Sequence, residues 1–503
     1  MPAEHDARFD PVFSYPFARE HGLILVECAE TCVLAAKGAP GPQALLEARR
    51  VLRRPFTLQP VSERAFEELL GTFYAVEGLG AEDLDEGLKD EQGLDALVDD
   101  IATTSDLLDG NDDAPVIRLI NGLIAEAVKL KASDIHVEPY ENALSVRLRV
   151  DGVLNEVLSL SARTAPLIVS RIKVMARLDI AEKRIPQDGR ISLTIGGKAL
   201  DVRVSTLPAR HGERVVMRLL DKDQDHFDLN QLGMPPELVK TFRRVLDEPN
   251  GILLVTGPTG SGKTTSLYAG LAELNDRSRN ILTVEDPVEY GLDGVGQTQV
   301  NAKVGMTFAA GLRAILRQDP DVVMVGEIRD LETVQIAVQA SLTGHLVLST
   351  VHTNSAIAAV TRLRDMGVEP FLLASTLKAV MAQRLVRRLC SECAREVPVG
   401  PLEAAMFQGL VDCPRTHRIP VGCPECSHTG YRGRVGLYEL VRIDETLARM
   451  IHDDAREQDM EDYAFQSSQN LLQSGLGHAA AGTTSLAEIM RVCRHQDADD
   501  GSV

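Results

Sequence analysis

A glycine-rich loop between an apolar run and a helix-forming stretch constrains this chain more than any other segment. Residues 257–264 read Gly-Pro-Thr-Gly-Ser-Gly-Lys-Thr, and the apolar run 251–256 precedes them. This order matches the GxxxxGK[ST] loop, which joins a strand to a helix. Its glycines let backbone N–H groups reach phosphate oxygens without an intervening Cβ, and the following helix adds its positive amino-terminal end. The sequence therefore predicts a site for a nucleoside triphosphate.

The predicted site takes a nucleoside triphosphate and Mg²⁺ as its expected ligands. Lys263 is expected to reach the β- and γ-phosphates, and the hydroxyl of Thr264 is placed to hold Mg²⁺. The predicted nucleotide-binding residues are Gly257, Pro258, Thr259, Gly260, Ser261, Gly262, Lys263, Thr264 and Thr265.

Composition argues against a nucleic-acid partner. The formal net charge is −20, Trp is absent and aromatic residues make up only 4% of the chain. Nucleic-acid surfaces are basic and often stack bases on aromatic rings. The charge is uneven, since residues 82–113 hold thirteen acids against the single Lys89, a net of −12.

The sequence also indicates where the protein works. No run of about 20 apolar residues is present, so we expect no membrane-spanning helix. The amino-terminal residues are polar without a signal-peptide pattern, and we expect a cytoplasmic protein. In that reducing compartment Cys28, Cys32, Cys413 and Cys493 are interpreted as ordinary thiols.

A chain of 503 residues should hold three or four domains, and changes in periodicity along it predict six segments. Helical spacing appears in 45–52 and 65–70, and a strong amphipathic helix is predicted over 116–130. The predicted segments are a small N-terminal domain (1–78), an acidic linker (79–113), an α+β domain (114–228), an ATPase core (229–386), a tetracysteine subdomain (387–435) and a helical C-terminal region (436–503).

Two of these segments show the clearest patterns. In the α+β segment, alternating strands are separated by glycine turns, which is typical of hairpins. In the core segment, apolar strands alternate with helices, which predicts a parallel sheet with crossover helices. The expected core strands are 252–256, 281–284, 322–325 and 346–350.

Acidic residues follow two of these strands. Glu327 comes after 322–325 and resembles the end of a Walker B strand, although Gly326 stands where that motif usually has Asp. Glu327 is expected to act on Mg²⁺; a strand-end cap is the alternative. Glu285 ends the strand 281–284 and is the candidate for orienting the attacking water; a surface acidic turn is the alternative.

Histidines and arginines supply further candidates. His345 and His352 flank the strand 346–350 and could sense the γ-phosphate or carry a proton, or they are structural. Arg203 and Arg218 lie on strands before the core, and each could stabilise transition-state charge or form a surface ion pair. The same alternatives hold for Arg313 and Arg317, four residues apart on a predicted helix.

Two CxxC pairs, 29 residues apart, predict a zinc site. Four thiolates in such pairs suit tetrahedral Zn²⁺ of a structural kind; redox chemistry and unpaired thiols are the alternatives. The predicted ligands are Cys390, Cys393, Cys423 and Cys426.

Together these segments resemble the secretion ATPases of the type II secretion and type IV pilus superfamily, most closely the type II secretion branch. The resemblance covers about 105–495. Beside the glycine-rich loop it is carried by Ala-Ser-Asp-Ile-His at 132–136 and by the segments 184–190, 211–219, 285–290, 311–321, 326–330 and 343–354.

The resemblance implies a multidomain α/β fold. Its ATPase core would be RecA-like, with a PAS-like α+β domain before it and a zinc insert within the C-terminal part. It also implies residue roles: Glu285 lies in the family's Asp box, Glu327 in its atypical Walker B motif, and His345 and His352 in its His box. Arg203 and Arg218 match positions that reach nucleotide phosphates.

The resemblance further implies a homohexamer that hydrolyses ATP in the cytoplasm, peripherally attached to the inner membrane. Such a motor drives pseudopilus assembly and the export of folded proteins across the outer membrane. Residues 1–78 would dock on a bitopic inner-membrane protein (the L type), and the core on a polytopic one (the F type). The nearest alternative is a type IV pilus assembly or DNA-uptake ATPase. A nucleic-acid translocase and a non-hydrolysing scaffold are further alternatives.

Overall fold

The computed structural model describes residues 13, 21–28, 32–38, 40–52, 54–62, 66, 114–195, 198–221, 228–407 and 413–493. The chain divides into two compact units, Met1–Lys222 and Asp223–Val503. Among the helices of the described residues, none is both long and apolar enough to cross a bilayer.

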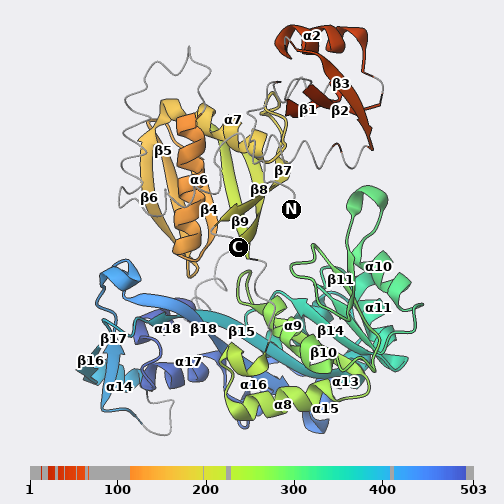
Figure 1. The fold of residues 1–503 in the computed structure, drawn as a ribbon. Helices are drawn as coiled ribbons and strands as arrows, with labels where there is room; N and C mark the ends of the chain where they lie inside the picture. Colours follow the sequence, from red (N-terminus) through yellow and green to blue (C-terminus); the bar gives the residue numbers. More distant parts are fainter. Residues whose placement is uncertain are drawn as a thin grey trace, which may run out of the picture. The chain divides into compact units, whose positions relative to one another are not determined.

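The first unit begins with a small three-stranded sheet of order β1-β2-β3 (Figure 1). Along the chain, one helix connects β2 to β3. Its elements are β1 (Leu23–Cys28), β2 (Cys32–Lys37), α2 (Pro42–Leu52) and β3 (Phe56–Val61). The helix predicted over 45–52 is confirmed as part of α2. The helix predicted over 65–70 and the acidic linker 79–113 lie outside the described residues.

One cysteine in this sheet corrects the sequence interpretation. Cys32 is disulfide-bonded rather than a free thiol. It starts β2, which pairs antiparallel with β1. Antiparallel pairing brings residues of neighbouring strands within the Cα distance that a disulfide needs, and residue spacing alone does not show which cysteine is so placed.

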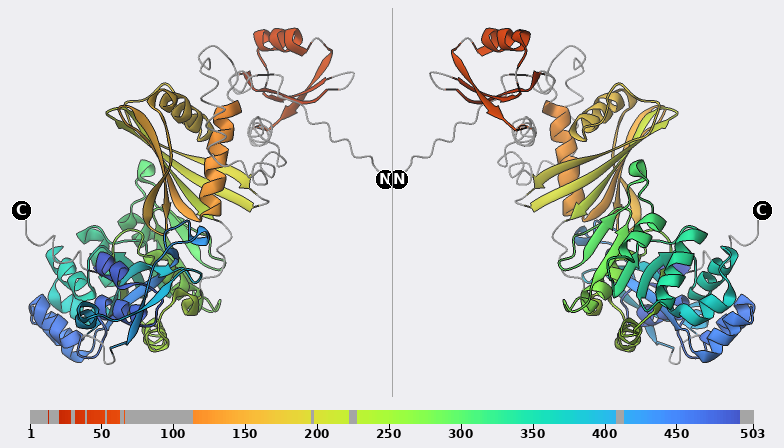
Figure 2. Two further views of the ribbon diagram at one scale, coloured as in Figure 1. Left: turned by 90° about the vertical axis from the view of Figure 1, so that its left-hand side faces the viewer. Right: turned by 90° about the vertical axis from the view of Figure 1, so that its right-hand side faces the viewer.

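The rest of the first unit is a six-stranded antiparallel sheet of order β6-β5-β4-β9-β8-β7. Two helices lie against one face of it (Figures 1 and 2). The elements are α6 (Ala114–Lys129), β4 (Ala132–Pro139), β5 (Ala143–Val150), β6 (Val153–Ser161), α7 (Ala165–Met175), β7 (Gln187–Ile195), β8 (Lys198–Ala209) and β9 (Gly212–Asp221). The predicted amphipathic helix and the hairpin between β7 and β8 are confirmed.

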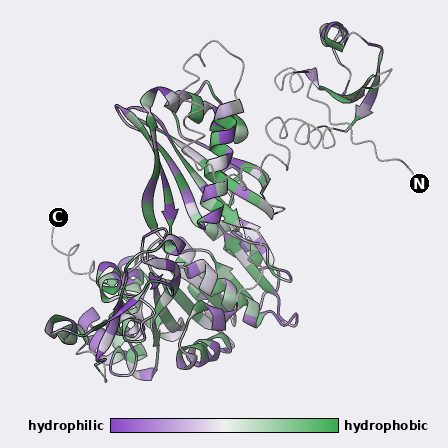
Figure 3. Ribbon diagram, turned by 60° about the vertical axis from the view of Figure 1, so that its left-hand side comes forward, coloured by the Kyte–Doolittle hydropathy of each residue, from purple (hydrophilic) through white to green (hydrophobic). Residues whose placement is uncertain are grey.

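Strand alternation gives this sheet one apolar and one charged face. Ile135 and Val137 pack with α6 and α7, whereas Asp134, His136 and Glu138 point to the opposite face. In Figure 3 the ribbon of α6 carries both apolar (green) and polar (purple) stretches, as expected for an amphipathic helix.

The second unit is built on a seven-stranded sheet of order β12-β11-β13-β14-β10-β15-β18. All neighbours are parallel except β15 and β18. The strands are β10 (Gly251–Thr256), β11 (Ile281–Glu285), β12 (Gly296–Gln299), β13 (Val322–Val325), β14 (Leu346–Val351), β15 (Leu377–Leu389) and β18 (Tyr431–Arg442). The four predicted core strands are confirmed, each within a residue.

Helices cover both faces of this sheet, as expected for a parallel α/β fold. The helices α8 (Pro236–Leu246) and α9 (Lys263–Leu274) pack on one face. The other face packs against α10 (Phe308–Ile315), α11 (Leu331–Leu342), α12 (Ala356–Asp365) and α13 (Pro370–Thr376). Side-chain caps begin several of them: Thr307, Asp330 and Ser355 each accept the backbone N–H three residues further on.

The long antiparallel pair β15–β18 carries the C-terminal elements. Along the chain, a small two-stranded sheet and a short helix follow β15 and precede β18. They are β16 (Arg395–Pro398), α14 (Pro401–Met406) and β17 (Thr416–Ile419). The helices α15 (Glu445–His452), α16 (Glu457–Ala464), α17 (Leu471–Ala480) and α18 (Leu486–Cys493) follow. The strand β15 crosses the boundary predicted at 386, and β18 makes residues 431–442 part of the core sheet.

Candidate functional site

The glycine-rich loop follows β10 at the carboxyl edge of the parallel sheet, and α9 begins at Lys263. Gly257, Gly260 and Gly262 all have positive φ angles, of 145°, 78° and 86°. A Cβ on Gly257 would lie 2.4 Å from the backbone oxygen of Gln383, and one on Gly262 would lie 2.8 Å from its Nε2. Glycine is therefore required at both positions, for conformation and for space.

The side chain of Lys263 turns back over this loop. Its Nζ donates to the backbone oxygens of Gly257 at 2.7 Å and Pro258 at 3.1 Å. Burial lowers the pKa of Lys263 to about 8, against an opposing effect of the Glu327 carboxylate. The ammonium of Lys263 is therefore held by two neutral backbone oxygens. The charged oxygens of a phosphate are stronger acceptors and would replace them.

Glu327 and His352 meet Lys263 at the same edge. Glu327 follows β13 and His352 follows β14, and Glu327 Oε2 lies 3.3 Å from His352 Nε2. His352 Nδ1 lies 3.5 Å from Lys263 Nζ, at the outer limit of a hydrogen bond. Arg329 also pairs with Glu327, and this contact raises the pKa of Arg329. A ring proton on Nε2 would let His352 donate to Glu327, and its Nδ1 could then accept from Lys263 Nζ.

Glu285 reaches the same edge but is enclosed. It is 3% exposed, and three donors occupy its two oxygens. Tyr268 of α9 donates to Oε2, while Thr283 and Gln297 donate to Oε1 at 2.6 and 3.0 Å. Burial and this contact with Glu285 raise the pKa of Tyr268. Glu285 therefore connects the loop helix α9 to β11 and β12.

The two predicted histidines lie at opposite ends of one strand. His345 precedes β14 and His352 follows it, and a six-residue strand spans about 20 Å. His345 Nδ1 contacts the backbone oxygen of Ala340 at 2.9 Å and Thr343 Oγ1 at 3.1 Å. The structure brings His352 to the loop and does not bring His345 there.

The predicted arginines of the first unit are register partners on adjacent strands. Arg203 on β8 lies opposite Arg218 on β9, and Arg218 Nε donates to Asp134 Oδ1 at 2.9 Å. In the second unit Arg313 forms an exposed ion pair with Glu332 at 2.7 Å. This pair agrees with the alternative of a surface ion pair for Arg313.

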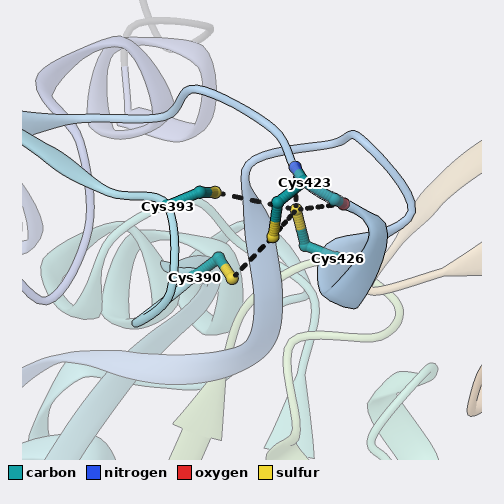
Figure 4. Close-up of side chains that lie close together, drawn as sticks. All are labelled: Cys390, Cys393, Cys423 and Cys426. Atoms are coloured by element: carbon teal, nitrogen blue, oxygen red, sulfur yellow. Dashed lines mark hydrogen bonds between the residues drawn. The ribbon is translucent and has the colours of Figure 1, made fainter.

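The pairing of β15 with β18 brings the two CxxC pairs together (Figure 4). The four Sγ atoms all lie within 4.8 Å of one another, and three of the pairs are separated by 3.7, 3.8 and 3.9 Å. Four Zn–S bonds of about 2.3 Å in a tetrahedron would place sulfurs about 3.8 Å apart. The cluster consists of Cys390, Cys393, Cys423 and Cys426.

Backbone donors surround this cysteine cluster. Gly422 N donates to Cys393 Sγ at 3.3 Å, and Cys423 N and Gly430 N donate to Cys426 Sγ at 3.2 Å each. Such N–H groups stabilise thiolates and orient metal ligands. The cluster therefore fits Zn²⁺ both in its spacing and in the hydrogen bonds around its sulfurs.

Three residues that contact Glu285 or Glu327 were not among the predicted site residues. They are Tyr268, Gln297 and Arg329. The motif spacing gives no signal for Tyr268 and Gln297, because only the packing of α9 and β12 against β11 places them. Arg329 stands two residues after Glu327 in the motif 326–330, and that proximity is a usable signal.

The loop, its lysine and the acids at the carboxyl edge of a parallel sheet define a P-loop ATPase. Residues 109–491 match the family described as type II/IV secretion system protein, and residues 13–74 match the family of the amino-terminal domain of GSPII protein E. The chain belongs to the type II/IV secretion system protein family, as a type II secretion ATPase.

Curated relatives agree over nearly the whole length. The chain is 55% identical over 485 residues to a type II secretion system protein E of Aeromonas hydrophila, covering 96% of this chain and 97% of that protein. It is 55% identical over 453 residues to type II secretion system ATPase E of Vibrio cholerae, with 90% of each covered. The Legionella pneumophila ATPase DotB shares the fold, with a TM-score of 0.54 and 21% identity over 74% of this chain and 94% of that one.

Proposed function

We propose that this chain is the cytoplasmic motor of a type II secretion system and that it hydrolyses ATP where Lys263, Glu327 and His352 meet. The observation that carries the proposal is the meeting of these three side chains beside the glycine-rich loop. In this proposal the γ-phosphate replaces the carbonyl oxygens that now hold Lys263 Nζ. Lys263 then offsets the negative charge that spreads over the transferring phosphoryl group.

Glu327 is proposed to accept a hydrogen bond, and then the proton, from the attacking water. Its carboxylate is only partly exposed and carries contacts from His352 and Arg329, which fix its orientation. His352 holds Glu327 in place and is also a route for the proton that leaves the water. Thr264, exposed on the first turn of α9, would hold Mg²⁺, which supplies charge neutralisation to the phosphates when bound.

We propose a different part for Glu285. Three hydrogen bonds occupy its oxygens, which supports a positioning function between α9 and β11 over direct contact with water. His345 is assigned no contact with this nucleotide, because it lies at the other end of β14. Arg203 and Arg218 are proposed to reach the phosphates from the α+β domain, which rests on the family resemblance.

The assembly and its partners also follow from the family. We propose a homohexamer peripherally attached to the inner membrane, which drives pseudopilus assembly and protein export. The family match of residues 13–74 supports docking of the N-terminal domain on a bitopic L-type protein. A polytopic F-type platform protein is the proposed partner of the core, and no nucleic acid is involved. The cysteine cluster is proposed to hold one structural Zn²⁺.

The catalytic proposal is tested by separating ATP binding from turnover. Glu327→Gln should bind ATP at close to the wild-type affinity and lose turnover by about 100-fold or more. Lys263→Ala should lose binding itself. Glu332→Gln is the matched control, since this acid is exposed and pairs with Arg313 away from the loop. Turnover of Glu327→Gln within twofold of the wild type would refute the assignment of Glu327.

The partner proposal is tested by co-purification with the full-length chain. Selective binding to the cytoplasmic domain of the secretion L-type protein supports the secretion system. Selective binding to the equivalent pilus protein would move the chain to type IV pilus assembly with its ATPase site unchanged. Binding to neither protein would refute the proposed docking of the N-terminal domain.

A further inference from the structure

The strand β15 continues past the end of β10 and forms a wall beside the glycine-rich loop. Thr256, the last residue of β10, pairs with Ala382, and the next two residues of β15 lie alongside the loop. A Cβ on Gly257 would lie 3.2 Å from Arg384 Nη1, and Ser266 Oγ donates to Gln383 Oε1 at 2.8 Å. The loop is thus bordered by the side chains of Gln383 and Arg384, which no predicted motif includes.

Arg384 is a buried cation without an acidic partner. It is 7% exposed, and no carboxylate of the described residues lies within ion-pair distance of it. Its donors reach only neutral oxygens: Nη2 bonds Asn354 O and Oδ1 at 3.0 and 3.1 Å, and Nη1 bonds Gln383 O at 3.2 Å. Burial lowers the pKa of Arg384, and the more distant Cys493 and Glu439 oppose this effect without reversing it. The charge of the guanidinium is therefore poorly compensated.

A second arginine of the same strand shows the usual arrangement. Arg387 is also partly buried, but it forms a two-point ion pair with Glu488 at 2.8 and 3.1 Å. A buried guanidinium normally has such a carboxylate, since an unpaired charge is costly in a low-dielectric interior. The contrast within one strand indicates that the position of Arg384 serves something other than stability.

Asn354, which Arg384 holds, belongs to the short loop 352–354 that also presents His352. Thr256 also holds this loop, because Thr353 N donates to Thr256 Oγ1 at 2.8 Å. Thr256 Oγ1 and Thr353 Oγ1 lie 2.7 Å apart. Two neighbouring strands, β10 and β15, therefore both hold the loop that follows β14 and orient His352 toward Glu327.

We infer that Arg384 is a positioning residue for ATP hydrolysis with two separable effects. Its fork of donors holds Asn354 and thereby keeps His352 facing Glu327. Its uncompensated charge, beside Gly257, adds to the positive potential that attracts the nucleotide phosphates, whose charge would compensate the guanidinium. This inference rests on the proposed use of Glu327 and His352 in turnover.

Conservative substitution separates these two effects. Arg384→Lys keeps the charge and loses the planar fork, so ATP affinity should stay within about threefold of wild type while kcat falls about tenfold. Arg384→Gln loses the charge as well, so the dissociation constant for ATP should also rise about tenfold. The measurements are binding of a fluorescent ATP analogue and steady-state turnover of the full-length chain, with Mg²⁺ present.

Arg387→Gln is the matched control for stability. It removes a partly buried guanidinium from the same strand, away from the loop, so it should lower Tm with little change in ATP affinity. Asn354→Ala provides a second route if Arg384→Gln does not fold, because it removes one acceptor of the guanidinium and should lower kcat more than affinity. Equal ATP affinity and kcat for wild type and Arg384→Gln would overturn the inference. So would losses of affinity and kcat in Arg384→Gln that are no larger than its loss of folded protein explains, as judged against Arg387→Gln.

Failure of the proposed function remains distinguishable in the same assays. If Glu327→Gln retained turnover, the assignment of Glu327 would be wrong. The effect of Arg384 on ATP affinity would still be measured directly, because binding does not depend on turnover.

Discussion

Glu439 should make the stability of the second unit fall as pH rises from about 4.5 to about 7. This residue of β18 is 2% exposed and accepts two backbone N–H groups, from Ala356 at 2.7 Å and Leu471 at 3.1 Å. These groups start the helices α12 and α17. Burial raises the pKa of Glu439 to about 7, although the two N–H groups oppose the shift. The perturbation we choose is Glu439→Gln, which removes the titration.

The magnitude follows from the shift. The folded state binds a proton that the unfolded state has released above its pKa of 4.5, so stability falls as pH rises through about 4.5 to 7. A shift of about 2.5 pKa units corresponds to about 3 kcal/mol of stability lost across that range. Glu439→Gln lowers the free energy of unfolding by an amount that does not depend on pH, since its amide offers one oxygen for two donors. The variant lacks the further loss of stability that wild type shows as pH rises.

The assay compares the two proteins by calorimetry from pH 5 to pH 8. Relative to wild type, Tm of the variant should rise with pH by about 6 °C over this range, at about 2 °C per kcal/mol for a unit of this size. Other titrating groups cancel in the difference. A Tm difference between variant and wild type that stays constant with pH would refute the assignment of the titration to Glu439.

Three further perturbations test other parts of the structure. Tyr268→Phe should leave Glu285 without one of its donors and lower the stability of the core by about 2 kcal/mol, measured by urea unfolding; an unchanged stability would contradict the role of this contact. Burial opposes ionisation of Glu488, but hydrogen bonds from Arg491 and Arg387 outweigh it and lower its pKa to about 2. Glu488→Gln should therefore cost about 2 kcal/mol at pH 7, and the difference should shrink as pH falls from about 4.5 toward 2; a difference independent of pH would argue against this. Purified protein should contain one zinc per chain by elemental analysis, and Cys393→Ser should reduce that content and lower Tm; full zinc content in the variant would exclude Cys393 as a ligand.

Motif spacing predicts the parts of the site that lie on consecutive residues. It places the loop 257–264 and the strands before Glu285, Glu327 and His352 within a residue, because an apolar run of four to six residues marks a buried parallel strand well. The two histidines were predicted alike, although the direction of the strand would have separated His345 from His352, since parallel strands present their carboxyl ends at one edge.

The remaining contacts depend on packing between elements far apart in the sequence. Nothing local indicates that Tyr268 reaches Glu285, or that Arg384 reaches Asn354 across thirty residues. The strand β18 was not predicted, for a related reason. Residues 431–442 follow a cysteine pair and precede helices, and only their pairing with β15 makes them part of the core sheet. Register partners of this kind are fixed by tertiary structure and not by composition.

The ladder between β15 and β18 also fixes where the residues between the two strands leave and rejoin the core sheet. The two strands pair from Ala379 with Arg442 to Leu389 with Tyr431, and the cysteine cluster ties their far ends together. Residues 394–422 therefore leave and rejoin the sheet at one closed point, about 23 Å along β15 from Gln383. Phe407 of this segment is buried in the main core cluster, so a fluorescent protein or affinity tag inserted at exposed positions away from Phe407 should leave the nucleotide site intact.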